Sequence, residues 1–545
     1  MLKVKDLTVK YLTQRSYALK SVNFEAQIGE FIVVAGASGS GKSTLAQVLM
    51  TLIPNFTKAE ISGDVSFNNL SFNEFTRENL VNTLGYVPQY PSDFTTSLLV
   101  EEEIVFLLEN LAVDSEEILS SLNHVLGELG ISKLKRRLIP ELSSGELQRV
   151  FLASALAFTP PIIILDEPIA RIDPKTEVKL VELLRNLADK GHLIIAFEHR
   201  LDYIVTKADR LIILKKGEIV SDEHPSTNVE MLEEIDPPEL SLIDSKDEEK
   251  ILSLENHIDS KRIISRIKNA NISELFKLEN KKPSDTAISL NHVNFRYNNK
   301  KDWILKDINL QFKKGESIGL MGINGCGKST LMKVILGVEK VKEGEVWHKG
   351  RRIKNVRKGK KDSIYVPENA KLFLIGPTPV KDLERQLRNE EEVMEIYSKF
   401  KMQKLMKRKL YHLSEGERRL FALINSFHFQ EDFILLDEPT IALDKKGRTI
   451  LLELVKTAKN KGNTVILASN DPRIVTSLDR LIVIEKGNIC LDGPPREVLY
   501  NLEQHTNLIP NQTVRFIQKL EKETGLSLPR ILNPKEFNDL LKEAE

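Results

Sequence analysis

The chain has 545 residues, a length that allows several domains, each able to bury its own core. Its 78 Lys and Arg residues balance 78 Asp and Glu residues, so no overall field favours nucleic acid or an anionic membrane surface. The sequence has two cysteines, Cys326 and Cys490, which are too few to form a disulfide framework, a four-thiolate zinc site or an iron–sulfur cluster by themselves. The first residues lack the apolar run of a signal peptide, and no stretch of about 18 uninterrupted apolar residues occurs. We therefore expect a soluble, cytoplasmic protein.

Residues 1–222 form the first predicted unit. An apolar strand at 31–35 leads into a glycine-rich loop, and a helix is expected from Ser43 to about Leu52. Further buried strands at 162–165 and 193–197 alternate with helical patterns. Alternating strands and helices predict an α/β fold with a mainly parallel sheet.

The remaining chain is divided into a linker, a second unit and a tail. Residues 223–285 are rich in charge but carry apolar residues at near-helical spacing, which predicts a linker with short helices. The second unit is expected at 286–498 and a helical tail at 499–545. Within the tail, Asn533 followed by Pro534 is typical of a helix start.

The two units are copies of each other. The segment Gly36–Ser43, GASGSGKS, returns 286 positions later as Gly322–Ser329, GINGCGKS. Later landmarks such as Asp166 and Asp437 are 271 positions apart, so the second copy is 15 residues shorter in between. A constant offset on each side of one deletion indicates a duplicated domain.

Each copy carries the pattern G-x-x-x-x-G-K-[ST] between a strand and a helix, the context of a phosphate-binding loop. Glycines let backbone N–H groups surround the phosphates, and the helix N-terminus adds a partial positive charge. Lys42 and Lys328 are expected to reach the terminal phosphates, and Ser43 and Ser329 to bind Mg²⁺. The nucleotide-binding positions predicted in the two loops are Gly36, Ser38, Gly39, Gly41, Lys42, Ser43 and Thr44, and Gly322, Asn324, Gly325, Gly327, Lys328, Ser329 and Thr330.

Apolar strands in both copies end in paired carboxylates, Asp166 with Glu167 and Asp437 with Glu438. The first carboxylate of a pair can hold Mg²⁺ through water. The second can orient or deprotonate the attacking water, work typically worth about 10² to 10⁴ in rate. A solvated acidic pair that caps the next segment is the alternative interpretation, and the nearby phosphate loops argue against it.

A third repeated segment lies 24 residues before each acidic pair, at an expected helix start: LSSGE at 142–146 and LSEGE at 413–417. With these segments the chain resembles tandem ATP-binding proteins of the ABC superfamily, whose signature is usually written LSGGQ. Both copies depart from it at the first glycine and at the glutamine, but keep the serine and the second glycine. The resemblance implies two P-loop ABC-type nucleotide-binding domains in tandem, each with a RecA-like α/β core, a helical lid and an antiparallel β subdomain.

The resemblance also implies that the two domains pair head to tail within one chain, so that each ATP contacts the phosphate loop of one domain and the signature of the other. Site one would combine the first loop with Ser414 and Gly416, and site two the second loop with Ser143 and Gly145. ATP and Mg²⁺ are the expected cofactors. The implied catalytic residues are Glu167, His199, Glu438 and Gln89, and the implied Mg²⁺ ligands are Ser43, Gln89, Asp166, Ser329, Glu368 and Asp437.

Tyr11 and Tyr297, each just after the first strand of its unit, resemble the aromatic residue with which this superfamily stacks adenine. Stacking of this kind contributes about 1 to 3 kcal/mol. A tyrosine at a strand end is also a common core residue, which is the alternative here.

The two predicted sites differ at two positions. His199 can hydrogen-bond the γ-phosphate and carry positive charge, whereas Asn470 keeps the hydrogen-bonding reach without the charge. Glu368 replaces the neutral amide of Gln89 with a carboxylate that can bind Mg²⁺ but repels phosphate oxygens. We therefore expect site one to hydrolyse ATP quickly and site two slowly.

Within the superfamily, the chain most resembles the fused ATPase subunits of energy-coupling factor (ECF) importers. The resemblance rests on short segments at 100–104, 109–111, 198–202, 208–210, 492–498 and 513–541. It implies uptake of a micronutrient, a vitamin or a transition-metal ion, at the cytoplasmic face of the cell membrane. The implied partners are an integral membrane scaffold protein, docked against the lid between Gln89 and Ser143, and a small substrate-binding membrane protein. No nucleic acid partner is expected.

The alternative function is that of a soluble ATPase of the ABC-F kind, which acts on ribosomes. The linker of such proteins is typically a basic helical hairpin that contacts RNA, whereas residues 223–285 hold more carboxylates than cations. A ribosome-recycling ATPase with iron–sulfur clusters is excluded by the cysteine count. The charge of the linker therefore favours the importer.

Overall fold

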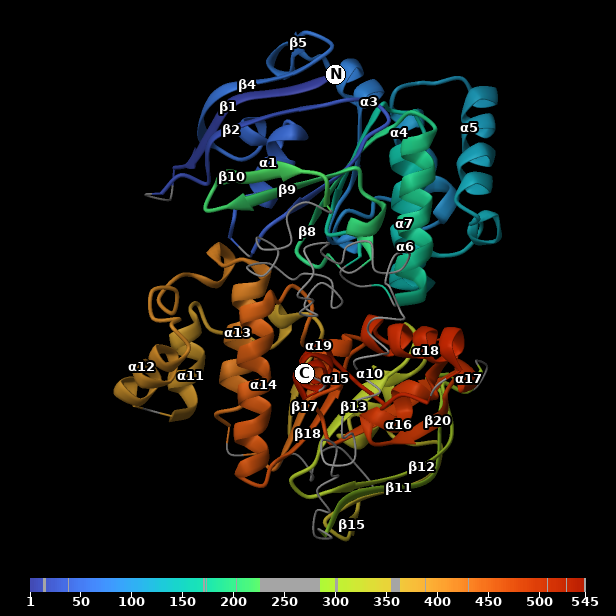
Figure 1. Cartoon of the computed structure of the whole chain (residues 1–545), viewed down its shortest axis with the longest axis vertical. Coiled ribbons are helices and arrows are strands. Elements are labelled where there is room, and N and C mark those ends of the chain that lie inside the picture. The colour runs from blue at the N-terminus through green and yellow to red at the C-terminus, as the bar shows by residue number, and fades with distance from the viewer. Residues whose placement is uncertain are drawn as a thin grey trace. The chain divides into compact units, whose positions relative to one another are not determined.

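The computed structural model describes residues 1–12, 16–37, 39–169, 172, 174–201, 203–225, 285–298, 302–353, 363–387, 389–429, 431–506, 508–525 and 527–543. The chain forms two compact units, Met1–Ile258 and Asp259–Glu545 (Figure 1). The short helices expected in the linker lie outside the described residues.

The core of the first unit is a six-stranded sheet with the strand order β10-β9-β3-β8-β7-β6. Five strands are parallel, and β10 runs antiparallel to β9, which confirms the mainly parallel sheet predicted from the sequence. The central strands β3, β7 and β8 are buried along their whole length, because both faces of the sheet are covered. The strands are β3 (Phe31–Ala35), β6 (Leu84–Val87), β7 (Ile162–Asp166), β8 (Leu193–Glu198), β9 (Arg210–Lys215) and β10 (Glu218–Glu223).

A second sheet of the first unit is antiparallel, with the strand order β2-β1-β4-β5. Its strands are β1 (Leu2–Tyr11), β2 (Leu19–Ala26), β4 (Ala59–Phe67) and β5 (Leu70–Ser71). Its apolar side chains, the helix α1 (Lys42–Leu49) and one face of the core sheet form a single hydrophobic cluster. The helix ends three residues earlier than the sequence suggested, because Thr51 takes a positive φ of 57° and Pro54 has no N–H for a continuing helix.

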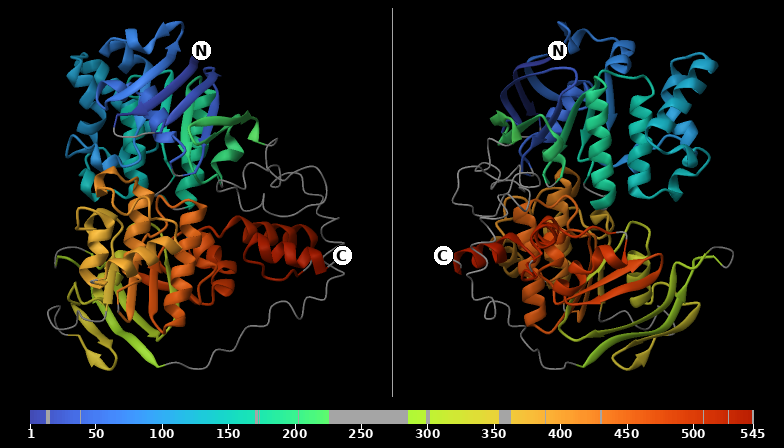
Figure 2. Two further views of the ribbon diagram at one scale, coloured as in Figure 1. Left: turned by 90° about the vertical axis from the view of Figure 1, so that its left-hand side faces the viewer. Right: turned by 45° about the vertical axis from the view of Figure 1, so that its right-hand side comes forward.

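The other face of the core sheet is covered by helices that also build the lid. The helices of the unit after α1 are α2 (Leu52–Asn55), α3 (Arg77–Thr83), α4 (Val100–Asn110), α5 (Ser115–Glu128), α6 (Ser144–Leu156) and α7 (Pro174–Asp189). Helices α4 to α7 share one hydrophobic cluster with this face of the sheet. Figure 1 and the right view of Figure 2 show α4 and α5 on the opposite side of the unit from the blue antiparallel strands.

The second unit repeats this architecture. Its core sheet has the order β16-β17-β18-β13-β19-β20 and its antiparallel sheet the order β12-β11-β14-β15. Its strands are β11 (Thr286–Phe295), β12 (Leu305–Lys313), β13 (Ser317–Met321), β14 (Glu343–His348), β15 (Arg351–Arg352), β16 (Ser363–Val366), β17 (Phe433–Asp437), β18 (Thr464–Ala468), β19 (Arg480–Glu485) and β20 (Asn488–Gly493). The predicted fold, with a core, a lid and an antiparallel subdomain in each unit, is confirmed.

The lid of the second unit has shorter helices. Its helices up to the last core strand are α10 (Lys328–Ile335), α11 (Pro379–Leu387), α12 (Glu390–Lys399), α13 (Glu415–Ser426), α14 (Lys445–Asn460) and α15 (Pro472–Val475). Helices α11 and α12 have 9 and 10 residues, against 11 and 14 in α4 and α5. Part of the deletion seen in the sequence therefore falls in the lid.

The tail after β20 is helical and packs on itself. It contains α16 (Pro495–Tyr500), α17 (Leu502–His505), α18 (Gln512–Thr524) and α19 (Pro534–Glu543), and α19 begins at the predicted proline. Arg496 pairs with Glu536 at 2.9 Å, and the Tyr500 hydroxyl donates to the carbonyl of Ile531 at 3.0 Å. Over the part of the chain that the structure describes, no helix is long and apolar enough to cross a membrane.

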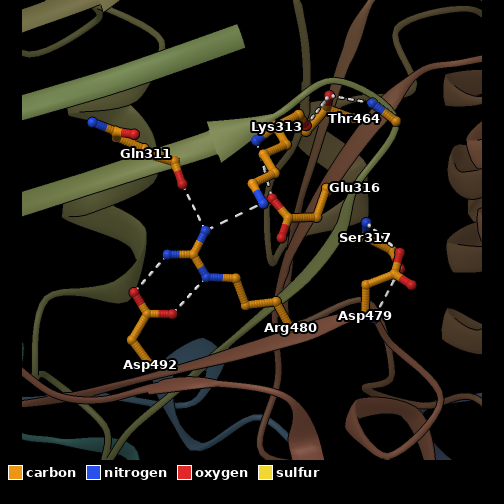
Figure 3. A network of polar contacts seen from close by, with 9 residues as sticks. Gln311, Lys313, Glu316, Ser317, Thr464, Asp479, Arg480 and Asp492 are labelled. Atoms are coloured by element: carbon orange, nitrogen blue, oxygen red, sulfur yellow. Dashed lines mark hydrogen bonds and ion pairs between the residues drawn. The ribbon is translucent and has the colours of Figure 1, made fainter. Parts of the chain in front are cut away.

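A polar network joins the two sheets of the second unit at the start of β19 (Figure 3). Arg480 binds both carboxylate oxygens of Asp492 on β20, each at 2.5 Å. The same guanidinium donates to the main-chain carbonyl of Gln311 on β12 at 2.6 Å and lies 3.7 Å from Glu316. The first unit repeats this network around Arg210, so both copies anchor the antiparallel sheet to the core in the same way.

Replacing the arginine of this network is expected to destabilise the second unit. Arg480→Leu leaves a carboxylate and a carbonyl without their donor, which costs about 1 to 3 kcal/mol and lowers the melting temperature by about 2 to 10 °C. The control is Arg352→Leu, whose pair with Glu345 at 2.7 Å is exposed and is expected to contribute less than about 1 kcal/mol. Thermal denaturation of the full chain measures both, and equal shifts would contradict the structural role of Arg480.

Candidate functional site

The predicted catalytic residues of the first unit lie at one edge of its core sheet. Strand β3 ends at Ala35 just before the phosphate loop, β7 ends at Asp166, and His199 directly follows β8. Gln89 comes two residues after the end of β6. Because these strands are parallel, their carboxyl ends meet at the same edge, where open α/β sheets bind their ligands.

Both phosphate loops fold tightly around their lysines. Lys42 Nζ donates to the carbonyl of Gly36 at 2.6 Å, and Lys328 Nζ donates to that of Gly322 at 2.7 Å. A Cβ at Gly36 would lie 2.4 Å from a main-chain oxygen of β9, and one at Gly322 would lie 2.3 Å from a main-chain oxygen of β19. Any larger residue at these two positions would therefore push the loop away from the sheet.

The remaining loop residues are arranged alike in both copies. Gly39, Gly41, Gly325 and Gly327 have φ between 78° and 113°, the left-handed region that favours glycine. Helices α1 and α10 begin directly after the second and fourth of these glycines, so their free N–H groups lie at the loop. Ser38 lies outside the described residues.

In the first unit, three predicted catalytic side chains are in contact. Gln89 Nε2 donates to Glu167 Oε2 at 2.6 Å, and His199 Nδ1 lies 3.4 Å from Glu167 Oε1. Glu167 has a φ of 47°, a strained conformation for a residue with a side chain that is common at functional sites. The loop after β6, the end of β7 and the end of β8 thus meet at one carboxylate.

The electrostatics of this site separate the two neighbouring acids. Burial and the charge of Glu167 raise the pKa of Asp166 to about 7, although Lys42 opposes the shift. For Glu167, burial favours the neutral form, but His199, Lys42 and Gln89 outweigh it and lower its pKa to about 2. A carboxylate that stays ionised and weakly basic at neutral pH is suited to orienting an attacking water more than to removing its proton.

The corresponding residues of the second unit have different partners. Asn470 Oδ1 accepts from the backbone N–H of Gly322, and Glu438 Oε1 lies 3.4 Å from Lys328 Nζ. The pKa of Glu438 is raised, because burial and the charges of Asp437 and Glu368 outweigh Lys328. The carboxylate that corresponds to Glu167 is therefore paired with the phosphate loop of its own unit.

The two predicted adenine-stacking tyrosines lie beside the phosphate-loop helices. The Tyr11 hydroxyl is 3.1 Å from Thr44 Oγ1, and the Tyr297 hydroxyl is 3.4 Å from Thr330 Oγ1. The ring of Tyr297 meets Phe295 edge-on at 5.0 Å and is 51% exposed. The exposed ring of Tyr297 suits stacking on a base, whereas Tyr11 is partly buried and packs against the core. The role of both as adenine contacts stays a prediction.

The signature segments begin helices α6 and α13 with the same capping box. Ser143 Oγ accepts from the N–H of Glu146 at 3.3 Å, and the Glu146 carboxylate accepts from the N–H of Ser143 at 2.8 Å. Ser414 and Glu417 repeat this pair at 3.2 and 2.8 Å. A glutamate at the last signature position therefore stabilises the helix start, an effect that the sequence interpretation missed although the S-x-x-E pattern carries it.

The second signature glycine of the first unit has a packing role. A Cβ at Gly145 would lie 2.8 Å from the Thr176 side chain on α7. The signature helix and α7 therefore approach each other so closely that position 145 has no room for a side chain. Gly416 is buried in α13 of the second unit.

The acidic groups fit a divalent cation. Asp437 Oδ1 is buried with no hydrogen-bond partner within the described residues, while Asp437 Oδ2 accepts from the Tyr365 hydroxyl at 2.8 Å. Within the described ranges, no group of three or more His, Cys, Asp or Glu side chains is arranged to hold a metal ion by itself. A cation here would therefore depend on phosphate oxygens, water and one serine as well as the carboxylate, the ligand set that Mg²⁺ prefers.

Two phosphate loops with paired acids at the sheet edge define a P-loop nucleotide hydrolase with two sites. Comparison with known families agrees: residues 19–170 and 305–441 match the ABC transporter family model, more than half of the chain. The chain belongs to the ABC transporter family and is an ATPase with two ATP-binding cassettes in tandem.

Its relatives share this organisation over their whole length. An ABC transporter ATP-binding protein of Methanosarcina mazei is 30% identical, with 99% of this chain and 97% of the relative covered. One from Caldanaerobacter subterraneus is also 30% identical, with 97% and 98% covered. Among solved structures, the RNase-L inhibitor matches with a TM-score of 0.59 at 20% identity, covering 97% of this chain and all of that one. This last likeness is one of fold alone.

Proposed function

We propose that this chain is the ATP-hydrolysing subunit of an energy-coupling factor importer that takes up a micronutrient, a vitamin or a transition-metal ion. It would work at the cytoplasmic face of the membrane, bound to an integral membrane scaffold protein and a small substrate-binding membrane protein, without nucleic acid. Relatives described as ABC transporter ATP-binding proteins along 97% or more of the chain support a transport role. The observation that carries the proposal is the apolar surface of the two lids.

In both lids, exposed apolar side chains lie beside a backbone hydrogen bond that connects the segment before the first lid helix with the segment before the signature. In the first unit the N–H of Ile139 donates to the carbonyl of Leu98, and Leu98 and Leu138 are 68% and 43% exposed. In the second unit the N–H of Leu410 donates to the carbonyl of Pro377, and next to this bond Ile375 and Tyr411 are 82% and 68% exposed. We propose that these exposed apolar groups are the part of each lid that binds the membrane scaffold protein.

The two ATP sites are proposed to form between the cassettes. Ser414 and Gly416 would complete site one, and Ser143 and Gly145 would complete site two. Bound Mg²⁺ would neutralise phosphate charge. It would be held by Ser43, Asp166 and Gln89 at site one and by Ser329, Asp437 and Glu368 at site two.

A division of labour between the sites follows from their different contacts. At site one, Glu167 is ionised and touches both Gln89 and His199, so it can orient the attacking water while the histidine binds the γ-phosphate. At site two, Glu438 pairs with Lys328 and Asn470 bonds to the phosphate loop. We propose that site one hydrolyses ATP quickly and that site two holds it longer.

Purification of the chain from native membranes in mild detergent tests the proposed function. We expect two integral membrane proteins of different size to be recovered with it. Leu98→Asp and Ile375→Asp should each reduce this recovery by about tenfold or more, because a charge buried in an apolar interface is unfavourable. The matched controls are Phe56→Asp and Val338→Asp, at exposed apolar positions outside the lids, which should leave recovery unchanged. Recovery of ribosomes without a membrane protein would contradict the importer and favour the ribosome-acting alternative.

A further inference from the structure

The largest fully buried side chain among the described residues is an arginine of the second signature helix. Arg419 on α13 is 0% exposed. Its Nη1 donates to the carbonyl of Pro367 at 3.2 Å, and its Nη2 donates to the carbonyl of Glu368. These two carbonyls belong to the start of the loop after β16, the loop that carries the predicted metal ligand of site two.

The same guanidinium reaches the signature segment. Arg419 Nη2 lies 4.0 Å from the carboxylate of Glu415, the residue at the first glycine position of the signature. The neighbouring Arg418 holds that carboxylate from the other side at 3.1 Å and donates to the carbonyl of Leu410. One buried side chain therefore bridges the signature segment and the Glu368 loop inside a single unit.

The first unit has no such bridge. Gln148 occupies the position that corresponds to Arg419, is also buried, and its amide nitrogen has no hydrogen-bond partner within the described residues. An amide is shorter than a guanidinium and offers one nitrogen donor group in place of three. Over the residues that the structure describes, the bridge therefore occurs in the second unit and not in the first.

Both terminal nitrogens of the buried Arg419 guanidinium have partners in the Glu368 loop, and one of them also faces Glu415, so this side chain ties the Glu368 loop to the signature segment. We propose that Arg419 is a positioning residue that couples the two ATP sites: ATP bound by Ser414 at site one shifts the helix start, and Arg419 transmits this shift to Glu368 at site two. This inference rests on the proposed composite sites. Coupling is carried by a packed polar contact and not by a change of charge.

A mutant cycle on the full chain tests the coupling. Ser414→Gly removes the signature hydroxyl while costing the helix start only a few tenths of a kcal/mol. Glu368→Gln gives the second unit the neutral amide that the first unit has at Gln89. With Arg419 present, the change in kcat/KM caused by combining Ser414→Gly with Glu368→Gln should differ from the product of the two single changes by about fivefold or more. In Arg419→Gln the single effects should multiply to within about twofold.

Two further variants make the outcome decisive. Arg419→Lys keeps the charge but not the fork of donors and should also lose the coupling, so the test stands if Arg419→Gln does not fold. Arg418→Gln disturbs the same carboxylate without touching the Glu368 loop and should retain the coupling. Coupling that survives in both Arg419 variants, or independent effects in the unaltered chain, would overturn the proposal. If Ser414→Gly leaves kcat/KM unchanged, the composite site itself is wrong.

Discussion

Glu167→Gln is expected to lower steady-state ATP turnover by about 10²-fold or more, because the variant loses the ionised group that positions the attacking water. Glu438→Gln is expected to lower turnover by less than about threefold. The first carboxylate is held by Gln89 and His199, whereas the second is paired with Lys328. Turnover by the full chain at saturating ATP measures both.

The two glutamine variants are matched to each other. Both glutamates follow a core strand, both have a positive φ, of 47° and 44°, and the substitution keeps the shape of the side chain. Thermal denaturation of each variant checks that the units stay folded. Equal losses of turnover in the two variants would contradict unequal sites.

His199→Asn is expected to reduce turnover by about 10²-fold, while Asn470→Ala should change it by less than about threefold. His199 is 5% exposed and lies beside Glu167, where a donor to the γ-phosphate that can carry positive charge stabilises the charge shifted in the transition state. Asn470 instead bonds to the backbone of Gly322. The difference between the variants should appear in kcat more than in KM, because the contact strengthens in the transition state.

The reverse exchange is the sharper control. In Asn470→His, the second unit gains the histidine of the first, and Glu438→Gln made in that background should lower turnover more than it does in the unaltered chain. A His199→Asn variant that keeps full turnover would show that the switch position does not separate the sites.

The fold was accessible from sequence because its signals are local and repeated. The apolar run Ile162–Leu165 is long enough only for a strand, and the glycine loop after Phe31–Ala35 fixes the strand, the turn and the helix that follow. The helix start at Pro534 was predicted because proline fixes φ at the first helical position. Because the domain is duplicated, the same signals predict the fold of the second unit.

The site was accessible only in part, because contacts between distant residues leave no local pattern. The resemblance to ABC ATP-binding proteins implied that Glu167, His199 and Gln89 belong to one site, and the structure brings their side chains into contact. The sequence did not indicate the pairing of Glu438 with Lys328, which depends on how the phosphate loop closes on the end of β17. Helical spacing places Arg419 on the same face as the buried Ala422 and Leu423, but it does not indicate which distant groups the guanidinium contacts.

If one site hydrolyses ATP while the other retains it, the two nucleotides left on the chain after one cycle should differ. Orthovanadate, a mimic of the γ-phosphate in transfer, is added during turnover of radiolabelled ATP, and free nucleotide is removed by rapid gel filtration. We predict one ADP and one ATP for each chain, with the ADP lost in Glu167→Gln. Two ADP for each chain, or loss of both trapped nucleotides in Glu438→Gln, would contradict a division of labour between the two sites.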